Sequence, residues 1–214
     1  MSAARLPTGL YVITDSHLIP TDRLIDCVAR AIEGGAVMVQ YRDKDHPPAQ
    51  REHEAATLAG LCQRHGIPLI INDDIELART VGADGVHLGQ GDAAPEQARS
   101  RLGDDAIIGI SCYNRLENAR LASEQGASYV AFGRFFPSAS KPGAVFARQD
   151  LLVAARREFD LPIVAIGGIT PENGAGLVAA GADLLAVIHG VFGQPDIESA
   201  ARRYATLFKT DPAI

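Results

Sequence analysis

Short apolar runs rich in β-branched residues alternate with longer amphipathic stretches along the chain. The runs are continuous rather than alternating in polarity, which is typical of strands covered on both faces of a parallel sheet. They lie at 10–13, 37–39, 69–71, 85–88, 107–110, 129–132, 163–166 and 184–187. Helical patterns separate them, among them 24–32, 49–65, 116–124 and 151–159. This alternation, repeated eight times, predicts a parallel α/β fold.

A Gly-Ala signature recurs where the predicted helices return to the strands. Glycine ends a helix in the left-handed region without steric cost, and the following residues re-enter the sheet. The signature occurs at Gly34-Gly35-Ala36, Gly82-Ala83, Gly126-Ala127 and Gly181-Ala182. This regularity predicts a single (β/α)₈ TIM barrel over residues 1–214. An open, doubly wound sheet is the alternative, but no G-x-G-x-x-G motif follows the first run.

Length, charge and cysteine usage narrow the function classes. The chain of 214 residues suffices for a full core and lies near the short end of the range for TIM barrels. A formal net charge of −6 argues against a nucleic-acid partner. No apolar run reaches the roughly 20 residues of a membrane helix, and no apolar signal region precedes the first strand, so we expect a cytoplasmic protein without a membrane partner. Three widely spaced cysteines predict reduced thiols rather than disulfides or a zinc site.

Polar residues follow nearly every predicted strand, whereas the opposite rim carries the Gly-Ala turns. They lie at 14–15, 40–44, 72–74, 90–92, 111, 137–141, 167–170 and 188–190. Because TIM-barrel active sites occupy the carboxyl ends of the strands, this asymmetry predicts a site at that rim. The longest irregular connection, 133–148, starts from the same rim, and its length favours a functional role.

Two kinds of anion site are predicted at this rim. The pair Gly167-Gly168 and the segment Ile188-His189-Gly190 are similar to the backbone phosphate site that barrels often place after the last two strands, although the glycines alone would also serve tight turns. Arg42, Lys44 and Lys141 would surround a second, multiply charged anion, the alternative for Lys44 being a solvated surface lysine. Two anion sites predict two phosphorylated substrates.

Asp73 and Asp92 follow neighbouring predicted strands, so their carboxylates could converge on Mg²⁺, which favours one or two carboxylates plus substrate phosphate oxygens. Helix capping is the alternative for each aspartate taken alone.

Two histidines and a cysteine near the rim have less specific expectations. His87 lies within an apolar strand, and we expect it to pack in the barrel or to orient a neighbour. His189 lies at the mouth, where a role as a general base is the weaker alternative. Cys112 lacks an adjacent base and is expected to be a packed thiol.

In order and spacing, these segments resemble the thiamine-phosphate synthase family over nearly the whole chain. The matching segments are YVITD at 11–15, QYRDK at 40–44, IND at 71–73, GVHLGQGD at 85–92, GIS at 109–111, GRFFPSASK at 133–141 and IGGI at 166–169. The resemblance implies that 4-amino-2-methyl-5-hydroxymethylpyrimidine diphosphate joins hydroxyethylthiazole phosphate, giving thiamine phosphate and pyrophosphate. Mg²⁺-assisted ionisation followed by attack of the thiazole nitrogen needs no protein nucleophile.

The resemblance also implies roles for individual residues. The residues that would hold the pyrimidine diphosphate are Gln40, Arg42, Lys44 and Asn72. Asp73 and Asp92 would bind Mg²⁺, and Ser111 and Lys141 would contact the pyrophosphate. Ser138 and Ser140 would line the thiazole side, and Gly168, Val187 and Ile188 would face the thiazole phosphate. The catalytic groups are therefore expected to be Arg42, Lys44, Ser111 and Lys141.

Four positions depart from the family pattern. Ser138 and Ser140 stand where threonine is frequent, Asp74 where many members have arginine, and His189 where serine is frequent. Three other function classes stay open: a thiazole tautomerase on the same barrel, another phosphate-binding barrel such as an aldolase-like lyase, and a non-catalytic ligand sensor. Barrels of this kind commonly pair, so the sequence leaves a homodimer open as the oligomeric state.

Overall fold

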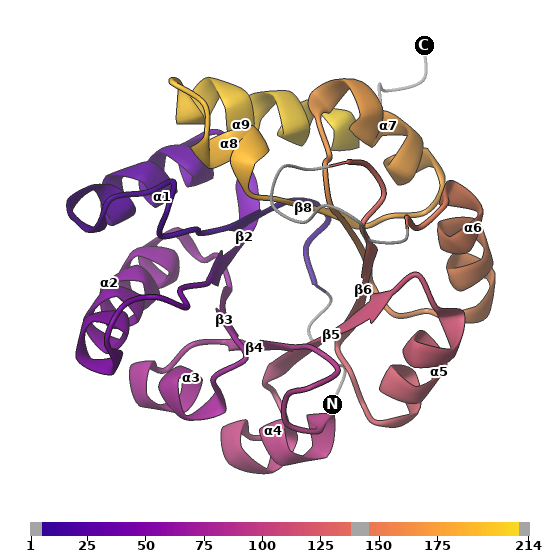
Figure 1. Ribbon diagram of the computed structural model, residues 1–214, viewed down its shortest axis with the longest axis horizontal. Coiled ribbons are helices and arrows are strands. Elements are labelled where there is room, and N and C mark those ends of the chain that lie inside the picture. Colours follow the sequence, from indigo (N-terminus) through magenta and orange to yellow (C-terminus); the bar gives the residue numbers. More distant parts are fainter. Residues whose placement is uncertain (1–5, 138–145, 210–214) are drawn as a thin grey trace.

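The computed structural model describes residues 6–137 and 146–209, and its strands form a closed barrel surrounded by helices (Figure 1). All neighbouring strands are parallel and follow one another in sequence order, with β8 returning to pair with β1. The strands are β1 (Gly9–Ile13), β2 (Ala36–Tyr41), β3 (Leu69–Asn72), β4 (Gly85–Leu88), β5 (Ile107–Tyr113), β6 (Tyr129–Gly133), β7 (Ile163–Ile166) and β8 (Leu184–Val187). The predicted (β/α)₈ barrel is confirmed.

Helices separate the strands and cover the outside of the barrel (Figure 1). They are α1 (Leu24–Glu33), α2 (Pro48–His65), α3 (Ile75–Val81), α4 (Pro95–Leu102), α5 (Leu116–Glu124), α6 (Gln149–Glu158), α7 (Pro171–Ala179), α8 (His189–Phe192) and α9 (Ile197–Ala205), with short 3₁₀ turns at Thr21–Arg23 and Thr206–Phe208. Within the described residues, no helix is long and apolar enough to cross a membrane.

The predicted glycine turns are confirmed by the backbone. Gly35, Gly82, Gly126 and Gly181 have φ values of 101°, 65°, 78° and 111°. A side chain would be strained in this region, whereas glycine adopts it freely. The chain therefore turns tightly at the end opposite the polar rim, and each strand starts close to the end of the helix before it.

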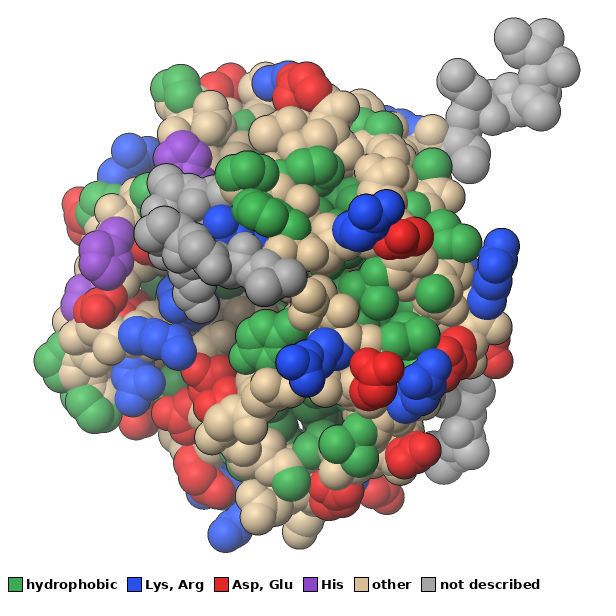
Figure 2. Space-filling model, turned by 45° about the vertical axis from the view of Figure 1, so that its right-hand side comes forward, with side chains coloured by type: hydrophobic (Ala, Val, Ile, Leu, Met, Phe, Trp, Pro, Cys, Tyr) green, Lys and Arg blue, Asp and Glu red, His purple; other side chains and the backbone are tan. Residues whose placement is uncertain are grey.

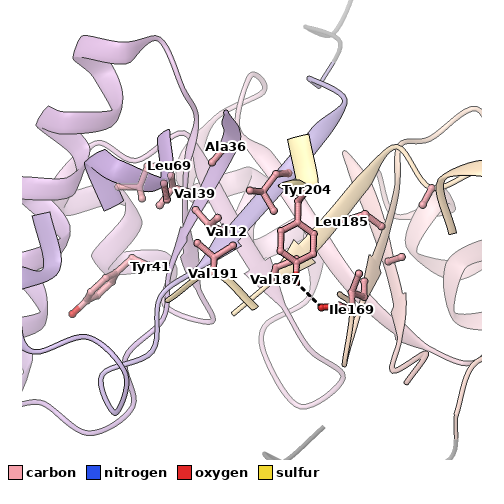
Figure 3. Packing of buried hydrophobic residues seen from close by; sticks show 14 of the residues in the cluster. Val12, Ala36, Val39, Tyr41, Leu69, Ile169, Leu185, Val187, Val191 and Tyr204 are labelled. Atoms are coloured by element: carbon pink, nitrogen blue, oxygen red, sulfur yellow. Dashed lines mark hydrogen bonds between the residues drawn. The ribbon is translucent and has the colours of Figure 1, made fainter. Parts of the chain in front are cut away.

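Two layers of apolar side chains stabilise the barrel. The layer between strands and helices includes Val12, Val39, Leu185 and Tyr204, and Figure 3 shows the Tyr204 ring among these residues. The Tyr204 hydroxyl donates a hydrogen bond of 2.9 Å to the carbonyl oxygen of Ile169, which links α9 to the segment after β7. The second layer fills the barrel interior and consists of Tyr11, Ile13, Met38, Ile70, Tyr129, Ala131, Val164, Leu184 and Ala186.

One glycine of β5 creates the space for the ring of Tyr129 in the interior. A Cβ atom at Gly109 would lie 2.0 Å from Cζ and 2.3 Å from Oη of Tyr129, far inside van der Waals contact. The Tyr129 side chain is fully buried. The absence of a side chain at position 109 therefore lets the phenol group of Tyr129 reach across β5 inside the barrel.

The two ends of the long connection between β6 and α6 lie side by side. The backbone N–H of Ala147 donates to the carbonyl oxygen of Arg134 at 2.8 Å, and the Arg134 guanidinium lies 5.3 Å from the centre of the Phe146 ring. Such a cation–π contact fixes the guanidinium over one side of the ring.

Candidate active site

Two carboxylates and a lysine meet at the carboxyl rim. Lys44 Nζ lies 3.1 Å from Asp73 Oδ2. Burial raises the pKa of Asp73, hydrogen bonding to Lys44 lowers it, and the nearby Asp92 carboxylate raises it again, so the net direction is upward. The structure thus brings Asp73 and Asp92 close enough to repel one another when both are ionised. Such a pair is suited to a hard cation.

The backbone directs each of these aspartates toward the rim. Asp73 has a φ of 62°, a left-handed conformation that aspartate tolerates better than most residues, and its N–H donates to the carbonyl oxygen of His87 at 2.9 Å. Asp92 Oδ2 accepts a hydrogen bond of 2.7 Å from the N–H of Gly89. Neither side chain caps a helix in the structure.

Asp74 is the residue that caps a helix here. Its Oδ1 accepts a hydrogen bond of 2.9 Å from the N–H of Leu77 and so begins α3, and its Oδ2 lies 3.7 Å from Nη2 of Arg51. An N-terminal cap of this kind contributes about 1 kcal/mol. The aspartate that departs from the family pattern therefore has a structural function, and it holds an arginine of α2 beside the site.

An open pocket of about 1030 Å³ lies next to these carboxylates. Lys44, Asn72 and Asp73 line one side, and α3 and α4 contribute Glu76, Gln97 and Arg101 to the other. The pocket extends outward from the rim, so Gln40, Arg42 and Ser111 lie outside its lining. On the face shown in Figure 2, the described Lys and Arg side chains lie among Asp and Glu side chains and form no continuous basic area.

A buried hydrogen-bonded cluster supports the loop that carries Arg42 and Lys44. Asp43 Oδ1 accepts from the backbone N–H groups of Asp45 and His46 at 2.8 and 3.1 Å.

Further hydrogen bonds hold the two ends of this cluster. The Tyr41 hydroxyl donates to Glu54 Oε2 at 2.7 Å, and the Arg42 N–H donates to Thr14 Oγ1 at 2.9 Å. Asp43, His46 and Glu54 offer ligand atoms within 4.8 Å of one another, but donors from the protein already occupy the carboxylates. The sequence pattern gave no sign of this cluster.

A line of polar side chains crosses the barrel interior below the rim. Gln40 Nε2 donates to the Tyr11 hydroxyl at 2.6 Å, and the Tyr11 and Tyr129 hydroxyl oxygens are 3.0 Å apart. The Tyr129 hydroxyl lies 2.9 Å from His87 Nδ1, and His87 Nε2 lies 2.9 Å from Ser111 Oγ. Five residues from five strands are thereby linked, and the line ends at the partly exposed Ser111.

The environment of His87 keeps its imidazole neutral. Burial lowers the pKa of His87 to about 4, although the Asp92 carboxylate acts in the opposite direction. The ring also stacks on Tyr129, with centroids 5.6 Å apart and an angle of 20° between the planes. The structure therefore agrees with the expectation that His87 packs in the barrel, and it places His87 Nε2 within hydrogen-bond distance of Ser111.

The loops after β7 and β8 form the other side of the rim. Gly168 has a φ of 65°, and a Cβ atom there would lie 2.4 Å from the carbonyl oxygen of Pro137, so the glycine is required for close packing. Thr170 and Asn173 form a capping box at the start of α7. These two side chains therefore accept hydrogen bonds from backbone N–H groups at the start of α7.

The short helix α8 differs from α7 in this respect. It follows Ile188 directly, has no side-chain cap among the described residues, and its first backbone bond runs from the N–H of Val191 to the carbonyl oxygen of Ile188 at 3.1 Å. The N–H groups of His189 and Gly190 precede that bond. A short extra helix after the last strands is where TIM barrels often bind phosphate.

The three cysteines are unpaired and buried, as expected. Burial raises the pKa of Cys62 and Cys112 to about 12. Since the thiolate is the reactive form, we expect a thiol reagent at neutral pH to label these two residues slowly in the folded protein and rapidly after unfolding in urea. Mass spectrometry after timed labelling measures this difference. Complete labelling of Cys62 or Cys112 at the rate of a free thiol, without urea, would contradict the described packing.

The structure thus groups most of the described site residues in three sets. Lys44, Asn72, Asp73 and Asp92 lie together at the β2–β4 side, whereas Gln40 and Ser111 are joined through the interior hydrogen bonds. Val187 ends β8 and Ile188 leads into α8, on the same rim as Gly168. Ser138, Ser140 and Lys141 lie outside the described residues.

Comparisons with known proteins agree on one family. A family model described as thiamine monophosphate synthase matches residues 10–191. A thiamine-phosphate synthase of Nitrosococcus oceani is 52% identical over 200 residues, covering 94% of this chain and 92% of the relative. One from Acidithiobacillus ferrooxidans is 50% identical over 206 residues, covering 95% of both chains.

Solved structures extend the agreement to three dimensions. The thiamine phosphate pyrophosphorylase of Pyrococcus furiosus superposes with a TM-score of 0.85 at 32% identity, covering 95% of this chain and 96% of that one. A 3-hexulose-6-phosphate synthase, at 17% identity and a TM-score of 0.68, shares the fold alone. The resemblance recognised in the sequence is confirmed, and the chain belongs to the thiamine monophosphate synthase family of transferase enzymes.

Proposed function

We propose that this enzyme joins 4-amino-2-methyl-5-hydroxymethylpyrimidine diphosphate to hydroxyethylthiazole phosphate and releases thiamine phosphate and pyrophosphate. The observation that supports this most directly is the meeting of Lys44, Asp73 and Asp92 at the carboxyl rim. A diphosphate needs positive charge and a cation site side by side, and these three side chains provide both. Membership of the synthase family supports the same substrates.

The donor set at the rim fits Mg²⁺. The Asp92 carboxylate raises the pKa of Asp73, a divalent cation would relieve this repulsion, and oxygen ligands are those that Mg²⁺ prefers. In this proposal Asp73 and Asp92 hold the ion, and its charge, when it is bound, stabilises the negative charge of a departing pyrophosphate. Arg42, Lys44 and Lys141 contribute further positive charge, and Asn72 and Gln40 hold the pyrimidine diphosphate.

The bond changes require little of the protein beyond binding and charge. The carbon–oxygen bond between the pyrimidine methylene and the diphosphate breaks, and its electron pair leaves with pyrophosphate. The lone pair of the thiazole nitrogen then forms the new bond to the methylene carbon, so no protein nucleophile or base is used. Fixed positive groups and hydrogen-bond donors around the leaving group lower the barrier by several kcal/mol in such sites. Ser111 supplies one of these donors.

The other half of the rim suits the second substrate. The uncapped start of α8 and the preceding residues, Val187 and Ile188, would hold the thiazole phosphate together with Gly168. Backbone N–H groups at a helix start bind phosphate without a cationic side chain. Ser138 and Ser140, which lie outside the described residues, would line the thiazole side. We also propose a cytoplasmic homodimer without nucleic-acid or membrane partners.

A reaction with each component omitted in turn tests this function. The purified protein is expected to release pyrophosphate and form thiamine phosphate only when both substrates and Mg²⁺ are present. A coupled pyrophosphate assay and chromatography of the product measure the two outcomes. Isomerisation of a thiazole tautomer without pyrophosphate release would support the tautomerase instead. If the protein shows neither of these two activities, the synthase proposal loses its support.

A further inference from the structure

The distances between the two hydroxyl groups and the imidazole inside the barrel allow either direction of donation, and the Gln40 amide at one end selects one of them. An amide nitrogen only donates, so the bond from Gln40 Nε2 makes the Tyr11 oxygen an acceptor. Tyr11 has one proton left, and its neighbour at 3.0 Å is the Tyr129 oxygen. Tyr129 then gives its own single proton to His87 Nδ1 at 2.9 Å. Each hydroxyl thus accepts from the residue before it and donates to the next.

This direction decides where His87 carries its proton. A neutral imidazole has one N–H, and Nδ1 is occupied as an acceptor of the Tyr129 proton, so the N–H lies at Nε2. A ring nitrogen that accepts a hydrogen bond carries no proton, so the imidazole is neutral in this arrangement. Nε2 is 2.9 Å from Ser111 Oγ and therefore donates to it. Among the residues that the structure describes, the Ser111 hydroxyl proton then has no acceptor inside the barrel.

We propose that His87 is a positioning residue whose Nε2–H tautomer, fixed by Tyr129, orients Ser111 so that the Ser111 hydroxyl proton points to a pyrophosphate oxygen at the mouth. The choice of anion rests on the proposed function. With the opposite direction, Ser111 would donate to His87 and present only lone pairs to the anion, which would repel it. The line of hydrogen bonds therefore converts a serine that can donate or accept into a fixed donor.

The tautomer can be measured in the free protein. Long-range ¹H–¹⁵N spectra of protein with ¹⁵N-labelled histidine distinguish a protonated ring nitrogen from a bare one, and the signal of His87 among the six histidines is assigned by its loss in His87→Gln. We expect a neutral ring with the proton at Nε2 at neutral pH. Tyr129→Phe should allow the Nδ1–H form to appear. An Nδ1–H tautomer or a charged ring in the unaltered protein would overturn the proposal.

Binding of inorganic pyrophosphate with Mg²⁺, measured by calorimetry, tests the consequence for the anion. Loss of a hydrogen bond to a charged group costs enough binding free energy that Ser111→Ala should weaken pyrophosphate binding by about tenfold or more. Tyr129→Phe should weaken it several-fold, but should have no further effect in a Ser111→Ala background, because it acts through Ser111. An equal loss in both backgrounds would overturn the proposal.

Two further variants separate positioning from stability. Tyr204→Phe removes a buried phenol hydrogen bond of similar length outside the line, so it should lower the melting temperature without altering the His87 tautomer. His87→Gln keeps an N–H donor near the position of Nε2 and should bind pyrophosphate more tightly than His87→Leu. If the unaltered protein binds no pyrophosphate, the choice of anion and the proposed function both fail, whereas a wrong tautomer alone overturns the positioning of Ser111.

Discussion

Asp73→Asn is expected to lower turnover by about 100-fold or more while the barrel stays folded, which corresponds to about 3 kcal/mol of lost transition-state stabilisation. The substitution removes the charge that we assign to Mg²⁺ and leaves Lys44 without its partner at 3.1 Å. Asparagine is chosen because residue 73 has a φ of 62°, which asparagine tolerates and alanine does not. Initial rates over a range of Mg²⁺ concentrations measure the effect, and we expect a higher Mg²⁺ requirement as well.

The neighbouring aspartate provides a matched control. Asp74→Asn makes the same chemical change one residue away, and asparagine caps a helix as well as aspartate does. This variant should retain most of the turnover and the melting temperature of the parent, because Asp74 serves α3 and Arg51. Wild-type-like turnover in Asp73→Asn, or an equal loss in both variants, would remove Asp73 from the proposed Mg²⁺ site.

Gly109→Ala is expected to destabilise the protein by about 3 kcal/mol, near the upper end of the usual cost of adding a methyl group to a packed core. The new Cβ would lie 2.0 Å from a ring carbon of Tyr129, and this ring is enclosed by the barrel. For a chain of this length, such a loss lowers the melting temperature by about 6–12 °C. Thermal unfolding followed by circular dichroism measures it.

Two comparisons isolate the clash with Tyr129. Gly60→Ala is the same substitution in α2, where the nearest atom is a flexible Arg64 nitrogen at 3.6 Å, and it should stabilise the helix by up to about 1 kcal/mol. In a Tyr129→Leu background, Gly109→Ala should cost much less, because the ring is gone. A full cost in that background would show that the destabilisation has another origin.

The architecture could be predicted from the chain because its signals are local. Continuous β-branched runs give parallel strands, and glycines such as Gly82 and Gly126, with φ values of 65° and 78°, end helices. The position of Asp73 and Asp92 after consecutive strands was also readable, since carboxyl ends of neighbouring strands share a rim. These inferences need only the order of elements along the chain.

The interior hydrogen bonds could not be predicted because they depend on which face of each strand points inward. A continuous apolar run does not show whether Tyr11 or Val12 faces the barrel, yet only the former contributes to the interior layer. Similarly, the requirement for Gly109 arises from a ring on the next strand. In the sequence, Asp74 is visible only as a departure from the family pattern, whereas its hydrogen bond with the N–H of Leu77 in the structure gives it a function.

The pairing of β1 with β8 has a consequence for synthesis of the chain. Gly9 pairs with Leu184, so about 175 residues separate two strands that close the barrel. At ribosomal rates of about 5–20 residues per second, the edge of β1 stays unpaired for roughly 10–35 seconds after it emerges. An exposed edge of this kind is prone to pair with other chains. The hydrogen bonds between β1 and β8 leave the finished barrel without an exposed strand edge. They can form only after β8 has been made, so until then the β1 edge of the nascent chain must be protected from pairing with other chains.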